Sequence, residues 1–330
     1  MKTNPPLGKA KTPLEYAGDP VAYAAWLYYS EQRTQNEIAI ELGVSRQTVA
    51  NYLTDARNRG LVTIRLSDEI LQRESVGHNL CESYGLTAVH ILPDPTVQDP
   101  QVTRDRIAGA GAHVVQSLLQ EDSVLGVAFG RTMYALGEAM QPQEFPNATV
   151  VQVAGSSIDG RDTAPEFCTA LIASRLSAKC VNLHAPAFLS DPELCKRLVN
   201  EPSIKRQFEL MAKTDLLVFG VGELLPDTKF SDAPFLTDRV RDEYISKGAT
   251  SVIFGRFIDH LGSEVSGPLS NRTVSIDLET VKSIPKRLIV SGGTEKISAL
   301  NATLRSGYAT HFVTDMPTAK QLLKHTRDDG

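Results

Sequence analysis

Apolar residues near the start of the chain recur with the period of a helix. Over Val21–Ser30 they fall every three or four positions, and the residues on this face are Ala22, Ala25, Trp26 and Tyr29. This pattern predicts a helix that follows a flexible, proline-rich leader over residues 1–20.

Two more helices are predicted by their end signals. Thr34 is a good N-cap, and Glu37 three residues later completes a capping box. This second helix stops at Gly43, a residue typical of helix C-termini, and Ser45 caps a third helix from Arg46 to about Arg59. Helix, short glycine-containing turn and helix form the helix-turn-helix pattern of DNA-binding proteins.

The outward face of the third helix has the chemistry that reads DNA. Its Arg, Gln, Asn and Thr side chains can donate hydrogen bonds to base edges or phosphates in a major groove. The alternative is an ordinary helical hairpin, but the paired caps, the glycine turn and the polar face favour DNA binding. The residues expected to contact DNA are Gln35, Ser45, Arg46, Gln47, Thr48, Asn51, Tyr52 and Arg57.

Beyond the third helix the period changes. Apolar and polar residues alternate over Leu61–Leu66, which predicts a strand, the wing of a DNA-binding head that spans residues 21–66. Ser67 with two acidic residues behind it is then typical of a helix start. We expect a linker helix over residues 67–86, which connects the domains and takes part in dimerisation.

From Thr87 to the end, short β-branched runs alternate with longer amphipathic segments. Strand, loop and helix in repetition are typical of an α/β domain with a mostly parallel sheet. The expected strands are Ala88–Leu92, Val124–Phe129, Val150–Ala154, Cys180–Leu183, Leu216–Gly220, Ser251–Phe254 and Leu288–Val290, and the expected helices are Arg104–Gln120, Arg131–Met140 and Glu166–Ala178.

Glycine-rich loops follow four of these strands. In a parallel sheet, ligands bind beyond the carboxyl ends of the strands, where glycine lets the backbone approach an anion and helix N-termini favour it. The loops therefore predict a cradle for a phosphorylated small molecule, although glycine at such turns also serves plain packing. Gly220 and Gly222 do not make a dinucleotide fingerprint, because Leu225 stands at the third glycine position.

The net charge of −5 conceals an asymmetry. Residues 1–66 hold eight Lys/Arg against six Asp/Glu, while the rest of the chain holds 26 against 33. A locally basic segment joined to an acidic body is the charge pattern of a DNA-contacting head on a separate sensing domain.

Cysteine and hydropathy patterns exclude several classes of protein. The four cysteines stand far apart and the seven histidines are dispersed, so reduced thiols and no metal site are expected. No apolar run approaches the roughly 18 residues that span a bilayer, and no secretory signal is recognisable. The pattern favours a cytoplasmic protein.

The head and these loops together resemble the SorC family of bacterial sugar-binding transcriptional regulators, also grouped under the DeoR name. The resemblance extends from Ala24 to Leu323. The segments that carry it are Gln35–Leu66, Gly126–Thr132, Ala185–Phe188, Gly255–Asp259 with Gly262, Val290–Leu304, and Val313–Asp315 with Ala319.

The resemblance implies an architecture and a set of partners. Family members are typically tetramers whose heads bind double-stranded operator DNA and whose large domains, similar to sugar-phosphate isomerases and deaminases, sense phosphorylated sugars. It implies an α/β chain with a winged helix-turn-helix head, a Rossmann-like effector domain over residues 87–330, a homo-oligomer (dimer or tetramer), and no cofactor. The effector contacts that it implies are Gly130, Arg131, Thr132, Ser156, Gly222, Gly293 and Lys296.

One position departs from the family pattern. The family carries an acidic residue just before Gly255, where this chain has Val252. A carboxylate there would bind sugar hydroxyls, which valine cannot do. Either the effector differs from the commoner sugar phosphates, or Glu223 or Asp259 binds its hydroxyls instead.

Three functions are compatible with these patterns. We favour a DNA-binding transcriptional regulator of a carbohydrate or polyol catabolic operon, controlled by a small phosphorylated sugar or polyol and without catalytic residues. The alternative is a sugar-phosphate isomerase or deaminase with an accessory DNA-binding head, which would recruit Glu223, Asp259 or His260 for proton transfer. In a third reading the head binds another protein.

Overall fold

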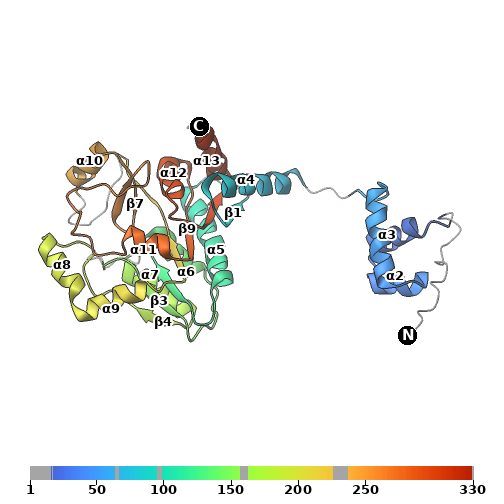
Figure 1. Cartoon of the computed structure of the whole chain (residues 1–330), viewed down its shortest axis with the longest axis horizontal. Helices are drawn as coiled ribbons and strands as arrows, with labels where there is room; N and C mark the ends of the chain where they lie inside the picture. Colours follow the sequence, from blue (N-terminus) through green and yellow to red (C-terminus); the bar gives the residue numbers. More distant parts are fainter. Residues whose placement is uncertain are drawn as a thin grey trace. The chain divides into compact units, whose positions relative to one another are not determined.

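The computed structural model describes Tyr16 and residues 18–63, 67–94, 99–156, 163–225 and 237–328. The chain forms two units, Met1–Asp68 and Glu69–Gly330 (Figure 1). Of the leader expected over residues 1–20, positions 1–15 and 17 lie outside the described residues, and the first helix begins at Pro20.

The first unit is a three-helix head. Its helices are α1 (Pro20–Tyr29), α2 (Gln35–Leu42) and α3 (Arg46–Asn58). They bury a small core that includes Leu27, Ile38, Leu42, Val49 and Leu53. A second buried cluster contains Val21, Ala25 and Ala56.

The predicted end signals of the head helices are confirmed. Thr34 and Glu37 form the reciprocal capping box at the start of α2, and Gly43 ends α2 in the left-handed conformation at φ 69°. The Ser45 hydroxyl accepts a hydrogen bond from the Thr48 amide at 3.0 Å and so caps α3.

The strand predicted at Leu61 does not begin there. Residues 61–63 carry no strand, and residues 64–66 lie outside the described chain. The Leu61 amide instead donates to Ala56 O at 2.9 Å and the Gly60 amide to Arg57 O at 3.0 Å, so both amides close the end of α3. An amide engaged in a helix cap cannot at the same time start a strand ladder, and the wing is not seen in these residues.

The second unit opens with α4 (Asp68–Tyr84), the helix predicted as a linker. The core of this unit is a seven-stranded parallel sheet. In spatial order the strands are β1 (Ala88–Leu92), β10 (His311–Asp315), β9 (Lys286–Val290), β5 (Leu216–Phe219), β2 (Val124–Val127), β3 (Thr149–Gln152) and β4 (Lys179–Val181). All residues of β5 and β10 are buried, as expected for parallel strands covered on both faces.

Helices cover this sheet (Figure 1). α5 packs on β1, β10 and β9, α7 packs on β2 and β3, and α6 lies against both of these helices; α12 and α13 pack together, and α13 also contacts β1 and β10. The helices of this unit after α4 are α5 (Pro100–Leu118), α6 (Arg131–Ala139), α7 (Pro165–Arg175), α8 (Pro192–Asn200), α9 (Pro202–Met211), α10 (Asp238–Ser246), α11 (Leu278–Ser283), the short 3-10 helix η2 (Thr294–Lys296), α12 (Ile297–Arg305) and α13 (Met316–Asp328).

The strand predicted at Ser251–Phe254 exists but lies in a different sheet. β6 (Gly222–Glu223), β7 (Ala249–Ile253) and β8 (Arg256–Asp259) form a separate antiparallel sheet. Phe254 and Gly255 link β7 to β8 with φ of 54° and 76°. A two-residue loop with both φ values positive joins antiparallel neighbours, whereas a parallel strand needs a long crossover.

A backbone crossing at Gly155 gives a test of the packing. A Cβ added to Gly155 would lie 2.6 Å from backbone atoms of Ala187, whereas one added to Gly109 within α5 meets nothing nearer than 3.9 Å. We expect Gly155→Ala to lower the free energy of unfolding by about 1–3 kcal/mol. Gly109→Ala should raise it by about 0.5–1 kcal/mol. Urea denaturation of the full chain measures both changes. A Gly155→Ala midpoint equal to that of the wild type would show that the backbone at Ala187 can move to make room for the added Cβ.

Candidate functional site

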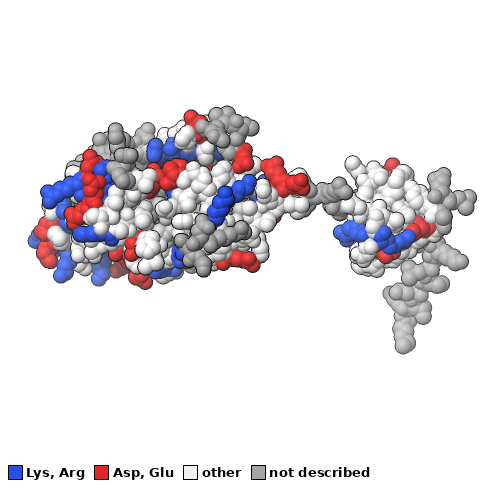
Figure 2. Space-filling view, turned by 90° about the horizontal axis from the view of Figure 1, so that it is seen from above, with Lys and Arg blue, Asp and Glu red and all other residues white. Residues whose placement is uncertain are grey.

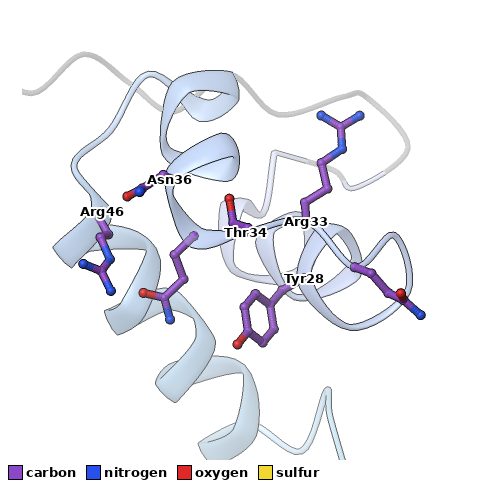
Figure 3. Close-up of a pocket in the computed structure, with 7 residues that line it drawn as sticks. Tyr28, Arg33, Thr34, Asn36 and Arg46 are labelled. Carbon is purple, nitrogen blue, oxygen red and sulfur yellow. The ribbon is translucent and has the colours of Figure 1, made fainter.

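The head carries a shallow groove where α2 and α3 begin. Its volume is about 620 Å³, and the residues that line it are Tyr28, Gln32, Arg33, Thr34, Gln35, Asn36 and Arg46. In the close-up, Asn36 and Arg46 lie on the side where α3 starts, and Tyr28 comes from α1 (Figure 3). The groove therefore joins polar side chains to the amino ends of two helices, where backbone amides lack intrahelical acceptors.

The predicted DNA-contacting face of α3 is exposed. Arg46, Gln47, Asn51 and Arg57 are exposed, while Val49, Leu53 and Ala56 are buried on the opposite side. Gln47 donates to the Asn51 side chain at 3.4 Å, so these two amides lie together on one turn.

Four of the residues predicted to contact DNA are partly committed to the head's own structure. Ser45 and Thr48 share a hydroxyl contact of 2.8 Å within the α3 cap. Tyr52 packs against the head core, and Gln35, at the first position of α2, is half-buried. Their exposed polar atoms border the same face, but the cap and the core determine their positions.

Two of the head's arginines are held by acids. Arg33 pairs with Glu41 at 2.7 Å, and Arg59 pairs with Asp19 at the start of α1. The hydrogen bond from Arg59 is the main reason that the pKa of Asp19 lies below its ordinary value. In the space-filling view basic side chains lie along one edge of the head with acidic ones among them, and both signs are also mixed over the visible face of the large unit (Figure 2).

In the large unit, five charged side chains from four elements converge at the carboxyl edge of the sheet. They are Arg104 on α5, Arg131 on α6, Glu223 on β6, and Glu295 and Lys296 on η2; Lys296 interacts electrostatically with each of the other four. Three cations therefore face two carboxylates, and the surplus positive charge suits an anionic ligand.

Burial perturbs the two central members of this charged edge. Burial lowers the pKa of Lys296, and the carboxylates of Glu223 and Glu295 oppose that change. Burial likewise raises the pKa of Glu223, with Lys296 as the strongest opposing influence. Glu223 Oε2 is buried and has no hydrogen-bond partner among the described residues. Opposed shifts of this kind, in an acid and a base that share a site, are typical of functional positions.

Gly130 and Gly293 give the charged edge its backbone shape. Gly130 stands before α6 with φ 105°, nothing lies within 4 Å of where its Cβ would be, and Thr132 follows in the first turn of α6. Gly293 has φ 110°, and the Glu295 carboxylate lies 2.3 Å from its Cβ position. Both positions require glycine, and Gly130 leaves open space in front of a helix N-terminus.

Three predicted effector residues have other roles in the structure. The Ser156 hydroxyl donates to Leu183 O at 3.2 Å. Gly222 faces Val252 on β7, where a Cβ would come within 3.2 Å of Val252 O, so glycine serves strand pairing there. Asp259 accepts the Leu261 and Ser263 amides, both at 2.9 Å, and closes the turn after β8 instead of joining the charged edge.

Arg104 and Glu295 were not predicted. Arg104 lies in the first turns of α5, a helix that follows a different strand from α6, so nothing local to the sequence connects it with Arg131. Glu295 precedes the predicted Lys296 directly, and its position in the same glycine loop was the available signal.

Polar atoms are also buried beneath the glycine loop. The Gly293 amide donates to Thr318 Oγ1, and the Thr318 amide donates to Asp315 Oδ1, both at 2.8 Å. Asp315 Oδ2, Ser291 Oγ and Thr314 Oγ1 are buried without hydrogen-bond partners in the described chain. The carboxyl ends of β9 and β10 thus carry buried polar atoms in addition to the charged side chains of the loop above them.

Two features are absent from the residues that the structure describes. Among them no group of three His, Cys, Asp or Glu side chains is arranged to hold a metal ion. No helix in those ranges is both long and apolar enough to cross a membrane.

Residues 68–324 match a family model described as "Putative sugar-binding domain". The chain is 33% identical over 309 residues to the uncharacterized transcriptional regulator YjhU of Escherichia coli K12, covering 92% of this chain and 94% of that protein. It is 27% identical over 301 residues to the deoxyribonucleoside regulator of Bacillus subtilis 168, covering 91% and 96%.

Solved structures share the fold. The full-length sorbitol operon regulator SorC from Klebsiella pneumoniae superposes with a TM-score of 0.70 at 22% identity, over 95% of this chain and 99% of that one. A transcriptional regulator from Streptococcus pneumoniae TIGR4 gives a TM-score of 0.73 at 22% identity, over 78% and 99%. These relatives are regulators, which counts against the isomerase or deaminase alternative. The chain belongs to the SorC/DeoR family of sugar-binding transcriptional regulators.

Proposed function

We propose that this protein regulates a carbohydrate or polyol catabolic operon by binding operator DNA through its head, under the control of a small phosphorylated sugar or polyol. The observation that carries the proposal is the charged edge, where Arg104, Arg131 and Lys296 surround the open backbone at Gly130. The proposed domains are the head over residues 21–66, the linker 67–86 and the effector domain 87–330, working in the cytoplasm.

Two regions of the head support DNA binding. The exposed Gln47 and Asn51 amides can read base edges, while Arg46 and the groove beside it can receive a phosphate near the helix ends. One such head buries too little surface for tight specific binding, so we propose a homodimer or homotetramer that places two heads on two half-sites.

The charged edge supports a ligand that is both anionic and hydroxylated. Lys296 and Arg131 would bind the phosphate, with Thr132 and the α6 N-terminus as hydrogen-bond donors. Glu223, with its unpartnered Oε2, would accept from a sugar or polyol hydroxyl, the role left open by Val252. Ser156, Gly222 and Asp259 have structural roles and drop out of the proposed contact set.

The experiment combines DNA and ligand binding by the full-length protein. Fluorescence anisotropy on the promoter fragment of its own gene should show salt-sensitive, sequence-preferring binding. In a thermal-shift assay with sugar phosphates and free polyols, only compounds of the effector class should raise the midpoint of thermal unfolding. A protein with no sequence preference on that fragment, or one that turns over a pentose or aminohexose phosphate, would disprove the proposal.

The titration of Glu223 predicts a pH dependence for anion binding. Because the pKa of Glu223 is raised above 4.5, its carboxylate ionises as the pH rises through that higher value and then repels an anion beside Lys296. We expect the affinity for sulfate, which keeps its charge over this range, to fall as the pH rises from 4.5 to 8. Glu223→Gln should flatten the profile and bind sulfate about three- to tenfold more tightly at pH 8. Calorimetric titration measures both, and identical profiles would place Glu223 outside the site.

A further inference from the structure

α4 is attached to the large unit mainly near its carboxyl end. Of its seventeen residues only Leu80 and Tyr84 are buried, while Ile70 and Leu71 near its start are exposed. α4 follows the head in the chain. The contacts that hold the last turn of α4 on the large unit therefore also determine the direction of the helix axis.

The Tyr84 hydroxyl meets two different helices. It donates to Asn301 Oδ1 on α12 at 2.8 Å, and Leu322 O on α13 lies 3.5 Å away. Tyr84 is 7% exposed and Asn301 is 6% exposed, so the contact is shielded from water. A phenol has one proton to donate, and at these distances the bond to Asn301 is strong while that to Leu322 is marginal.

Both helices lead back to the charged edge (Figure 1). α12 begins at Ile297, directly after Lys296 at the end of η2, and Asn301 follows Lys296 by five residues, about one and a half helical turns. α13 is tied to the same loop, because Thr318 in its first turn accepts the Gly293 amide at 2.8 Å. The loop that holds Lys296 is thus joined by continuous chain to α12 and by a hydrogen bond to α13.

We propose that Tyr84 is a positioning residue that couples ligand occupancy at the charged edge to the orientation of α4. This inference rests on the proposed function and specifies its regulation. An anion that draws Lys296 away from Glu223 and Glu295 moves α12 relative to α13. The Tyr84 hydroxyl then exchanges its acceptor on α12 for the one on α13, and α4 turns with it. Two acceptors on two different, neighbouring helices give this contact two alternative states, so that a small displacement at the loop changes the position of α4.

The test is hydrogen–deuterium exchange on the full-length protein with D-ribose 5-phosphate and, separately, inorganic phosphate as probes. In the wild type, either probe should slow exchange over residues 292–300 and change the exchange rates of α4 amides by about tenfold. In Tyr84→Phe the loop should still respond, while the α4 response falls to within about twofold, because the loss of one buried hydrogen bond corresponds to roughly a factor of ten.

Two other variants separate coupling from simple destabilisation. Asn301→Ala removes the acceptor from the opposite side and should abolish the α4 response in the same way, with no further loss in the double variant. Tyr244→Phe is the matched control: its hydroxyl is also buried and accepts the Leu269 amide at 3.0 Å, but it contacts neither α12 nor α4 through that bond. It should keep the full response.

The outcomes are distinguishable. A wild-type loop that responds without any change in α4, or a Tyr84→Phe protein that retains the α4 response, overturns the coupling and leaves the proposed effector site intact. A wild-type loop that responds to neither probe refutes the proposed effector site, and the coupling with it.

Discussion

Lys296→Ala is expected to lower the affinity of the protein for its phosphorylated effector by about 30- to 4000-fold. The ammonium group interacts with both carboxylates of the charged edge, and Glu223 would be left without its strongest counter-charge. Removing one member of a desolvated charge cluster typically costs 2–5 kcal/mol, which converts to a loss of this size. Isothermal titration calorimetry with a sugar phosphate identified by thermal shift measures it.

The control for Lys296 is Lys282→Ala. Lys282 lies on α11, half-exposed, above the ring of Tyr308 at 5.1 Å, and takes no part in the charged edge. Its removal should change the affinity by less than about twofold. If the two variants bind the ligand equally well, the anion is bound somewhere other than at the glycine loop.

Gln47→Ala is expected to weaken binding to the operator by about 10- to 100-fold while leaving non-specific DNA binding within about twofold. The exposed Gln47 amide has the donor and acceptor pair that reads an adenine edge, and a bidentate contact of that kind discriminates by about 1–3 kcal/mol. Anisotropy titrations on the operator and on a scrambled duplex at one fixed salt concentration separate the two effects.

Arg57→Ala on the same helix gives the contrast. Arg57 lies at the other end of α3, exposed, and its guanidinium reaches Thr54 at 3.4 Å. A phosphate contact should be lost there, so binding should weaken on both duplexes alike and the salt dependence should drop by about one unit of slope. If Gln47→Ala behaved in this way instead, Gln47 would be a backbone contact and the reading of bases would lie elsewhere on α3.

The features predicted correctly from the sequence are local ones. A capping box needs only Thr34 and Glu37, and a left-handed C-cap needs only Gly43, so the head could be predicted helix by helix. The parallel sheet followed from alternation of strand and helix. Strand pairing could not be predicted in this way, because Val252, Ile253 and Phe254 indicate a strand but do not indicate which strand lies next to it. The positive φ of Phe254 allows the tight turn that makes β7 and β8 antiparallel neighbours. A phenylalanine in the sequence gives no signal of a positive φ.

The charged edge shows the same limit. Arg131 and Lys296 could be predicted because each follows a glycine, Gly130 or Gly293, within three residues at a strand-to-helix turn. Arg104 could not, because it reaches the site only through the packing of α5 against α6. Ser156 and Gly222 look like ligand contacts in the sequence, yet in the structure they hold neighbouring backbone segments together. Small residues at a sheet edge serve packing and binding equally well, and only the three-dimensional neighbours distinguish the two.

The buried oxygens without hydrogen-bond partners beneath the glycine loop also lower the free energy of unfolding of this protein. Ser291, Thr314 and Asp315 are at most 4% exposed, and each leaves an oxygen without a hydrogen-bond donor among the described residues. An unsatisfied buried oxygen costs about 1–3 kcal/mol, and an isosteric change such as Thr314→Val removes that cost. The carboxyl ends of β9 and β10 are therefore a region where single substitutions are expected to raise the free energy of unfolding.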